Sequence, residues 1–142
     1  MTKVVLHEKL SVKENLISPQ VAYELVKGFY ELFDDREMVS MVVLNRQLNP
    51  LAWEMISVGG TSMCMIDPKI VFRRALQYKT ACSLIMFHNH PSGTLKISDA
   101  DKKITKMLVK GGHLLEFTVK DHIILTKDDY VSLATSEPTL FE

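Results

Sequence analysis

Apolar residues recur every three to four positions in three stretches of this chain, the spacing that predicts helices buried on one side. The first stretch follows Ser18-Pro19 and the second follows Asp67-Pro68, so each has an N-cap residue before a proline at the first helical position. The third begins at Ser98 and is expected to end at Gly111-Gly112. The inward positions are Val21, Leu25, Phe29 and Leu32; Ile70, Val71, Ala75 and Leu76; and Ile104, Leu108 and Val109.

Short segments rich in apolar and β-branched residues predict strands between these helices. Strands interleaved with helices predict an α/β fold, specifically a three-layer α/β/α sandwich with a mixed sheet. One segment, ACSLIMFH, is almost continuously apolar and is typical of a central strand buried on both faces. Binding sites in such folds lie beyond the carboxyl ends of central strands, which points to the polar loop after His88. The predicted strands are 38–45, 51–58, 81–88, 114–120 and 122–126, and the tail from Thr135 is expected to be loose.

The composition excludes several classes of protein. Lys plus Arg and Asp plus Glu number 17 each, so the net charge gives no support for binding to nucleic acid. No apolar stretch approaches the ~20 residues that cross a bilayer, and no membrane segment is expected. Cys64 and Cys82 stand apart in apolar runs, which favours buried reduced thiols and a cytoplasmic location.

The candidate chemistry lies in His88-Asn89-His90-Pro91-Ser92-Gly93, which is followed by Ser98-Asp99-Ala100-Asp101. Two histidines separated by one residue lie on the same side of an extended chain, so both imidazoles can reach one point. If Ser98 caps a helix, Asp101 lies in its first turn and can face the same point. Two imidazoles and a carboxylate suit Zn²⁺ and leave a fourth position for water. Taken separately, Ser-x-x-Asp is a helix cap and His-x-His is a pair of surface histidines; their conjunction favours a metal site.

The arrangement His88-x-His90-x7-Ser98-x2-Asp101 resembles the JAMM motif of JAB/MPN metalloenzyme domains, and HNHPSG is the form seen in RadC-type proteins. The segments Asp67-Pro68-Lys69, Asp121-His122-Ile123-Ile124 and Tyr130-Val131-Ser132 are also similar to that family. The resemblance implies a cytidine-deaminase-like α/β/α fold. It divides the chain into an N-terminal extension with one amphipathic helix (1–37), a zinc domain (38–134) and the tail (135–142).

The JAMM motif also needs an upstream Glu, and Glu54 is the only acid between Glu37 and Asp67. The resemblance implies that Glu54 takes a proton from a zinc-bound water and passes it to a leaving amine. It also implies that Ser98 donates a hydrogen bond to the developing oxyanion. The alternative for Glu54 is a carboxylate on an edge strand that faces water.

These features favour a zinc-dependent hydrolase of peptide or isopeptide bonds that acts on a peptide or protein substrate. A DNA-associated, repair-related accessory factor is the alternative. Residues 1–37 show one amphipathic helix and not the paired helical hairpin that full-length RadC proteins usually carry. A third hypothesis is hydrolysis or deamination of a phosphodiester or nucleobase, although the Cys-x-x-Cys of deaminases is absent. Asn89 replaces the Ser or Thr of eukaryotic deubiquitinating members, so ubiquitin is not carried over as the substrate.

Overall fold

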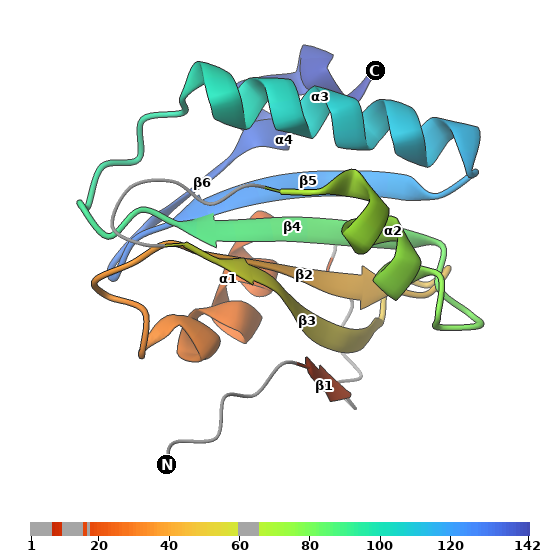
Figure 1. Cartoon of the computed structure of the whole chain (residues 1–142), viewed down its shortest axis with the longest axis horizontal. Helices are drawn as coiled ribbons and strands as arrows, with labels where there is room; N and C mark the ends of the chain where they lie inside the picture. Colours follow the sequence, from red (N-terminus) through yellow and green to blue (C-terminus); the bar gives the residue numbers. More distant parts are fainter. Residues whose placement is uncertain (1–6, 10–15, 17, 60–65) are drawn as a thin grey trace.

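The computed structural model describes residues 7–9, 16, 18–59 and 66–142 (Figure 1). These residues contain a six-stranded sheet with the strand order β1-β3-β2-β4-β5-β6. The strands are β1 (His7–Lys9), β2 (Met38–Leu44), β3 (Pro50–Val58), β4 (Ser83–Asn89), β5 (Thr118–Leu125) and β6 (Tyr130–Ser132). Cys64 lies outside the described residues, whereas Cys82 is half-buried with a free thiol.

The helices begin at the caps that the sequence predicts. Ser18 Oγ accepts a hydrogen bond from the Val21 amide, and Asp67 Oδ1 accepts one from the Lys69 amide. Both caps stand before a proline, which has no N–H to satisfy and is already set at a helical φ. The helices are α1 (Pro19–Val26), α2 (Pro68–Ala75), α3 (Asp99–Leu114) and α4 (Leu133–Ser136), with 3₁₀ helices η1 (Lys27–Tyr30) and η2 (Pro138–Phe141).

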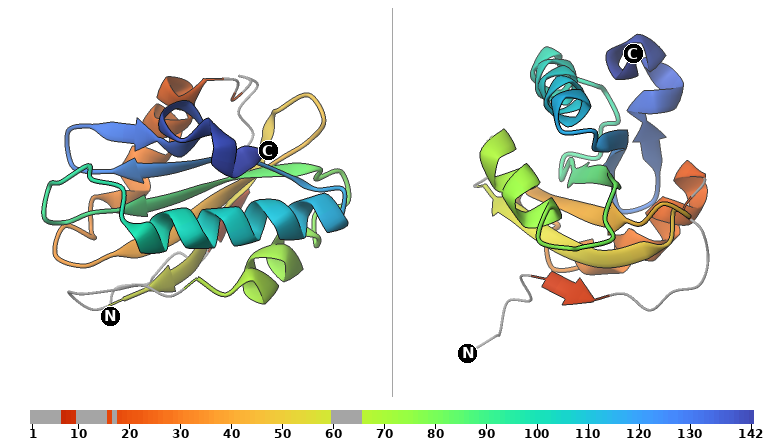
Figure 2. Two further views of the ribbon diagram at one scale, coloured as in Figure 1. Left: turned by 90° about the horizontal axis from the view of Figure 1, so that it is seen from above. Right: turned by 90° about the vertical axis from the view of Figure 1, so that its right-hand side faces the viewer.

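The sheet is mixed, because β4 pairs in parallel with β5 but antiparallel with β2. As expected, β4 is a central strand with every residue buried. Alternate side chains of the sheet enter two hydrophobic clusters, one on each face. The cluster that contains Trp53 and Phe87 packs under α1 and η1, and the one that contains Met41 and Met86 packs under α2 and α3. Figure 2 shows these helices on opposite sides of the sheet, so the fold is mixed α/β with helices on both faces.

Helix α3 continues through Gly111-Gly112, where the sequence predicts its end, and stops at Leu114. The glycines serve close packing here. After the helix the chain turns back, and the Phe117 amide donates to the Gly112 carbonyl at 2.8 Å. A Cβ atom at Gly112 would overlap the carbonyl oxygen of Phe117. The longer helix shortens the strand expected at 114–120, and the two expected strands form the single strand β5.

The C-terminal residues are not the loose tail expected from Thr135. They form α4 and η2, and Phe141 packs against the hydrophobic cluster under α3. Lys102 Nζ of α3 lies 3.3 Å from Glu137 Oε1, which adds an ion pair to this packing. At the other end of the chain, α1 covers the sheet directly through Ala22, Tyr23 and Val26. Among the helices in the described part of the chain, none has the length and apolar character that a membrane crossing requires.

We expect Gly112→Ala to lower the free energy of unfolding by about 2–3 kcal/mol, because the added methyl group must displace the main chain at Phe117. Gly28→Ala is the matched control, since a Cβ at Gly28 meets nothing within 4 Å. It should change the free energy of unfolding by no more than about 1 kcal/mol. Urea unfolding followed by circular dichroism measures both values. Equal effects in the two variants would show that the contact with Phe117 does not constrain α3.

Candidate metal centre

The candidate site lies at the carboxyl end of β4, where the sequence places it. Leu84 and Met86 point into the cluster under α2 and α3, so alternation along the strand directs His88 to the same face. The loop after His90 then crosses to Ser98, the N-cap of α3. This crossing brings the first turn of α3, with Asp101, over the end of the strand.

Three of the predicted residues come together here. His88 Nε2 lies 2.9 Å from His90 Nε2 and 3.2 Å from Asp101 Oδ1, and His90 Nε2 lies 3.7 Å from Asp101 Oδ2. All three side chains are largely shielded from solvent. One ligand atom from each residue lies within 4.8 Å of the others, a spacing at which one metal ion can be shared. In a tetrahedral zinc site with bonds of about 2.0 Å, ligand atoms are about 3.3 Å apart, which lies within the observed range.

The hydrogen-bond partners define the tautomer of each imidazole. Thr105 Oγ1 donates its only proton to the Asp101 carbonyl, at 2.7 Å, so it must accept from His122 Nδ1, at 2.6 Å. His122 Nε2 is therefore an acceptor, and it receives the Nδ1 proton of His88 at 2.7 Å. His90 Nδ1 donates to the Thr94 carbonyl at 3.0 Å. As neutral imidazoles, His88 and His90 therefore each present the lone pair of Nε2 toward a shared ligand position.

This donor set fits a divalent cation. Two Nε2 lone pairs that face each other at 2.9 Å repel, unless a cation or a proton lies between them. Neutral imidazoles held by hydrogen bonds through Nδ1 are the usual form of histidine ligands, and a carboxylate completes a set that suits Zn²⁺. The cluster therefore presents three ligand atoms that are oriented before any metal binds.

His122 belongs to this centre, although its spacing in the sequence gives no sign of it. It stands on β5, fully buried, next to Met86 of β4. Burial and, when His88 is protonated, the charge of that ring lower the pKa of His122 to about 3, so this imidazole is neutral and can accept the Nδ1 proton of His88. The segment Asp121-His122 contributes to the family resemblance, and this was the only signal in the sequence.

Asp101 and Ser98 form a capping box. Ser98 Oγ accepts from the Asp101 amide, and Asp101 Oδ2 accepts from the Ser98 amide, both at 3.0 Å. Burial alone would raise the pKa of Asp101, but the hydrogen bond and positive charge of His88 in its protonated form, together with the bonds to Ser98, hold it below its ordinary value. Asp101 is therefore both cap and ligand, and its carboxylate is ionised. Ser98 lies at the helix start with its hydroxyl proton not committed to the cap.

Glu54 is not brought to this cluster. Its Oε2 accepts a hydrogen bond of 3.0 Å from the hydroxyl of Tyr78, which follows α2. The sheet register aligns Glu54 with Met41, and Met41 with Met86, two residues before His88. Two strand spacings and two residues separate the Cα atoms of Glu54 and His88 by about 12 Å. Burial and the Glu54 carboxylate raise the pKa of Tyr78 to about 12, so the Tyr78 hydroxyl keeps its proton for this part-buried hydrogen bond. The position of Glu54 does not support its expected role in water activation.

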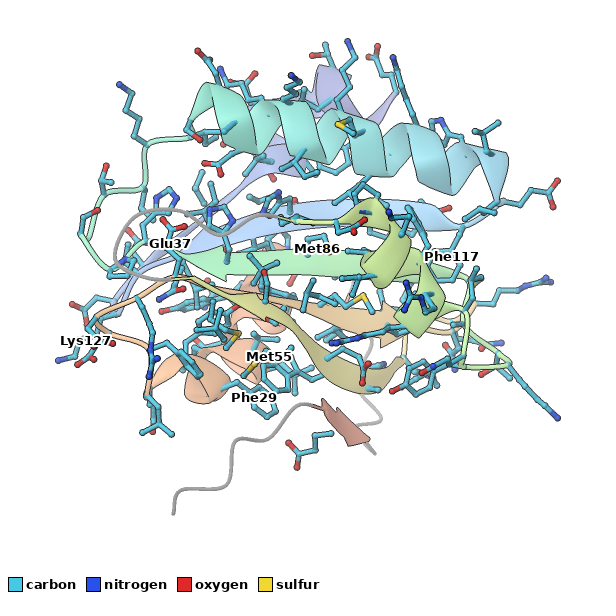
Figure 3. The ribbon with its side chains drawn as sticks, viewed as in Figure 1. Phe29, Glu37, Met55, Met86, Phe117 and Lys127 are labelled. Atoms are coloured by element: carbon cyan, nitrogen blue, oxygen red, sulfur yellow. The ribbon has the colours of Figure 1, made fainter. Side chains whose placement is uncertain are left out.

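Another acid, Glu37, lies beside the end of β4 (Figure 3). It directly precedes β2, and Val39 of β2 is paired with His88. Because side chains alternate along an extended chain, Glu37 emerges on the same face as Val39 and therefore as His88. Figure 3 shows Glu37 at the end of the sheet where β4 finishes and the loop to α3 begins. Sequence reasoning missed Glu37, whose position follows only from the pairing of β2 with β4.

A cavity of about 710 Å³ lies beside His90 and extends to η1, and neither His88 nor Asp101 lines it. Asn89, His90 and Pro91 contribute to one wall, and Tyr30, Phe33 and Leu125 contribute apolar surface. The cavity provides space for a ligand next to His90.

An α/β domain with histidines at the end of a central strand and an acid in the following helix defines a JAB-type domain with a candidate metal site. A comparison with known families agrees, since residues 16–138 match the family described as the RadC-like JAB domain. The chain belongs to the RadC-like JAB-domain family.

Its relatives include UPF0758 proteins from several bacteria. Those of Protochlamydia amoebophila, Chlorobaculum parvum and Pseudomonas fluorescens are 39%, 36% and 35% identical, over 78%, 89% and 94% of this chain. The matched regions cover 47%, 58% and 59% of those relatives. The chain therefore spans about half the length of these curated relatives.

We expect the wild-type protein to bind about one zinc ion per chain and His88→Ala to lose it, because two ligands hold a cation far more weakly than three. Asp101→Asn should also bind zinc weakly, while it keeps an oxygen for the Ser98 amide. Elemental analysis after gel filtration measures the bound metal. Glu54→Gln is the control and should retain the ion, and equal zinc in wild type and His88→Ala would contradict the assigned ligands.

Thr105→Val tests the hydrogen-bond chain through His122. The substitution keeps the shape of the buried side chain but leaves His122 Nδ1 without its acceptor, so His88 is no longer held in one tautomer. Zinc affinity should fall about 10- to 100-fold, measured by competition with a chromophoric chelator. Thr105→Ser should restore it to within about threefold of wild type. Unchanged affinity in Thr105→Val would show that the chain does not orient the ligand.

Proposed function

We propose that this domain is a zinc-dependent hydrolase of peptide or isopeptide bonds, with His88, His90 and Asp101 as the ligands and Glu37 as the general base. The observation that carries the proposal is the pair of Nε2 atoms that face each other beside the carboxylate of Asp101. Zn²⁺ bound there would polarise a carbonyl group and lower the pKa of a coordinated water to about 7. Membership of the family supports a cytidine-deaminase-like fold, and the chain's two isolated cysteines support a cytoplasmic location.

Glu37 takes the role that the resemblance assigns to an upstream acid. Its carboxylate accepts a proton from the attacking water and then donates that proton to the nitrogen of the leaving amine. The C–N bond breaks after water has formed the new C–O bond, and the acyl product leaves as a carboxylate. The proton taken from the water ends on the nitrogen of the released amine. The position of Glu37 on the ligand face, beside the end of β4, supports this role.

Ser98 would stabilise the negative charge that develops on the carbonyl oxygen. Its Oγ already accepts the Asp101 amide, which leaves the hydroxyl proton for donation. The same cap fixes Ser98 next to the ligand Asp101. The cavity beside His90 would hold one flank of a peptide or protein substrate.

The other proposed activities have less support. The balance of 17 basic and 17 acidic residues gives no favourable field for DNA. A DNA-associated factor would show strongly salt-dependent affinity that survives His88→Ala. Phosphodiesters and nucleobases remain substrates to include in the same assay, since an activated water is not specific to amides.

A peptide library that includes isopeptide-linked branches, incubated with the zinc-loaded protein and analysed by mass spectrometry, tests the activity. We expect new termini or released amines that depend on zinc and disappear with a chelator. Absence of cleavage by zinc-loaded protein, together with cleavage of a nucleotide substrate, would replace the peptidase proposal.

Glu37→Gln should lower kcat by about 10²- to 10⁴-fold while zinc remains bound, because the amide cannot accept the proton. Glu54→Gln is the matched control and should keep nearly full activity, since its side chain lies with Tyr78. If Glu54→Gln were the inactive variant and Glu37→Gln the active one, the assignment of the base would be wrong.

A further inference from the structure

Asn89 stands between the two histidine ligands but faces away from them. Its neighbour Phe87 points into the hydrophobic cluster under α1, and alternation directs Asn89 to that same face. The side chain is nevertheless almost fully buried, with 6% of its surface exposed. A buried amide requires hydrogen-bond partners, and their identity shows what Asn89 does.

All the hydrogen-bond partners of its side chain lie in residues 33–38, the segment that leads into β2 and includes its first residue. Asn89 Oδ1 accepts from the Met38 amide at 2.7 Å, and Nδ2 donates to the carbonyls of Phe33 and Arg36 at 2.6 and 3.1 Å. The orientation of the amide is unambiguous, because a main-chain N–H must meet an oxygen and two carbonyls must meet the NH₂ group. The backbone pairing of β2 with β4 includes Val39 and His88, and the side chain of Asn89 extends the contact to Met38 and beyond.

The contacts with Arg36 and Met38 bracket Glu37. The Arg36 carbonyl belongs to the peptide group before Glu37, and the Met38 N–H belongs to the peptide group after it. The carbonyl of Glu37 in turn accepts from the Gly59 amide at 2.9 Å. Both peptide groups around the Glu37 Cα are therefore held, which restricts its φ and ψ. The side chain of Glu37 emerges from this restrained backbone toward the opposite face, where the ligands lie.

We propose that Asn89 is a positioning residue that fixes Glu37 relative to the metal ligands. This inference rests on the proposed role of Glu37 as the base. Residues 88–90 then supply two metal ligands on one face of the sheet, while Asn89, on the opposite face, restrains the main chain that carries Glu37. A base displaced by about 1 Å can lose about 10²-fold in rate, so this restraint matters for catalysis.

The chemistry of the contact requires an amide at this position. An aspartate would still accept from Met38, but its carboxylate would face two carbonyl oxygens and repel them. Alanine would leave the Met38 amide and both carbonyls without this partner. Asn89→Ala and Asn89→Asp therefore disturb the segment in different ways, and either serves if the other folds poorly.

Asn45 provides a matched control. Its Oδ1 accepts from the Gln47 and Asn49 amides in the turn between β2 and β3, at the other end of β2. Asn45→Ala also removes side-chain to main-chain hydrogen bonds next to β2, but it leaves Glu37 in place. Comparison of the Asn89 variants with Asn45→Ala therefore distinguishes an effect on the position of Glu37 from a general loss of stability.

Amide hydrogen exchange by NMR tests the placement of Glu37 without substrate or metal. In Asn89→Ala we expect exchange at Met38 and Gly59 to rise at least about tenfold, because Gly59 reports on the Glu37 carbonyl. In Asn89→Asp the rise should appear at Gly59. Asn45→Ala should leave both rates within about twofold of wild type. Unchanged exchange at Gly59 in both Asn89 variants would overturn the inference.

Kinetics of the zinc-loaded full chain on its best library peptide provide the second measurement. Asn89→Ala or Asn89→Asp should retain zinc and lower kcat about 10- to 100-fold, with KM within about threefold of wild type. A loss no larger than that of Asn45→Ala would overturn a catalytic role for the restraint. If wild type cleaves nothing while Gly59 exchange rises, the hydrolase proposal fails and the placement of Glu37 by Asn89 stands.

Discussion

The alternation of side chains at the end of β4 is the constraint on which the centre depends. At residues 88–90, where β4 ends, two imidazoles point toward α3 and the side-chain amide of Asn89 points toward residues 33–38, which lead into β2. The strand is central and wholly buried, so its register is set by a hydrophobic cluster on each face. A shift by one residue would exchange the ligand face with the amide face and would also bury the wrong side chains. Core packing and site geometry are therefore determined by the same register.

The buried polar groups around the ligands form one connected set. Thr105 of α3 and His122 of β5 link the main chain of Asp101 to the ring of His88, and the capping box links Asp101 to Ser98. Each of these groups is satisfied by another part of the centre, so their burial is tolerated without bulk water. Asp121, the neighbour of His122, has a different function. Burial raises its pKa, and it accepts hydrogen bonds from the Ser132 hydroxyl and the Ala134 amide that hold the end of β6 and the start of α4 to β5.

Local patterns in the sequence were sufficient for α1, α2, the start of α3 and the strands β2, β3 and β4, and for three of the site residues. His88, His90 and Asp101 lie within one strand–loop–helix unit, so spacing and a helix cap were enough to bring them together. Glu54 and Glu37 could not be separated in this way, because the choice depends on which residues of β2 and β3 lie level with His88. That register comes from long-range pairing, and it assigns Glu54 to Tyr78. The role of His122 was not predicted for the same reason, since only the parallel pairing of β4 with β5 brings it to His88.

The close contact at Gly112 has a consequence for the far end of α3. The helix is fastened at its start by the capping box and near its end by the main chain of Phe117, so it cannot slide along its axis over the sheet. Eleven residues of α-helix separate Asp101 from Gly112, a distance of about 16 Å. The rigidity of the helix means that the contact at Gly112 helps to set the position of Asp101 relative to the sheet. The geometry of the metal ligands therefore depends on packing along the whole length of α3, and not only on the residues next to them.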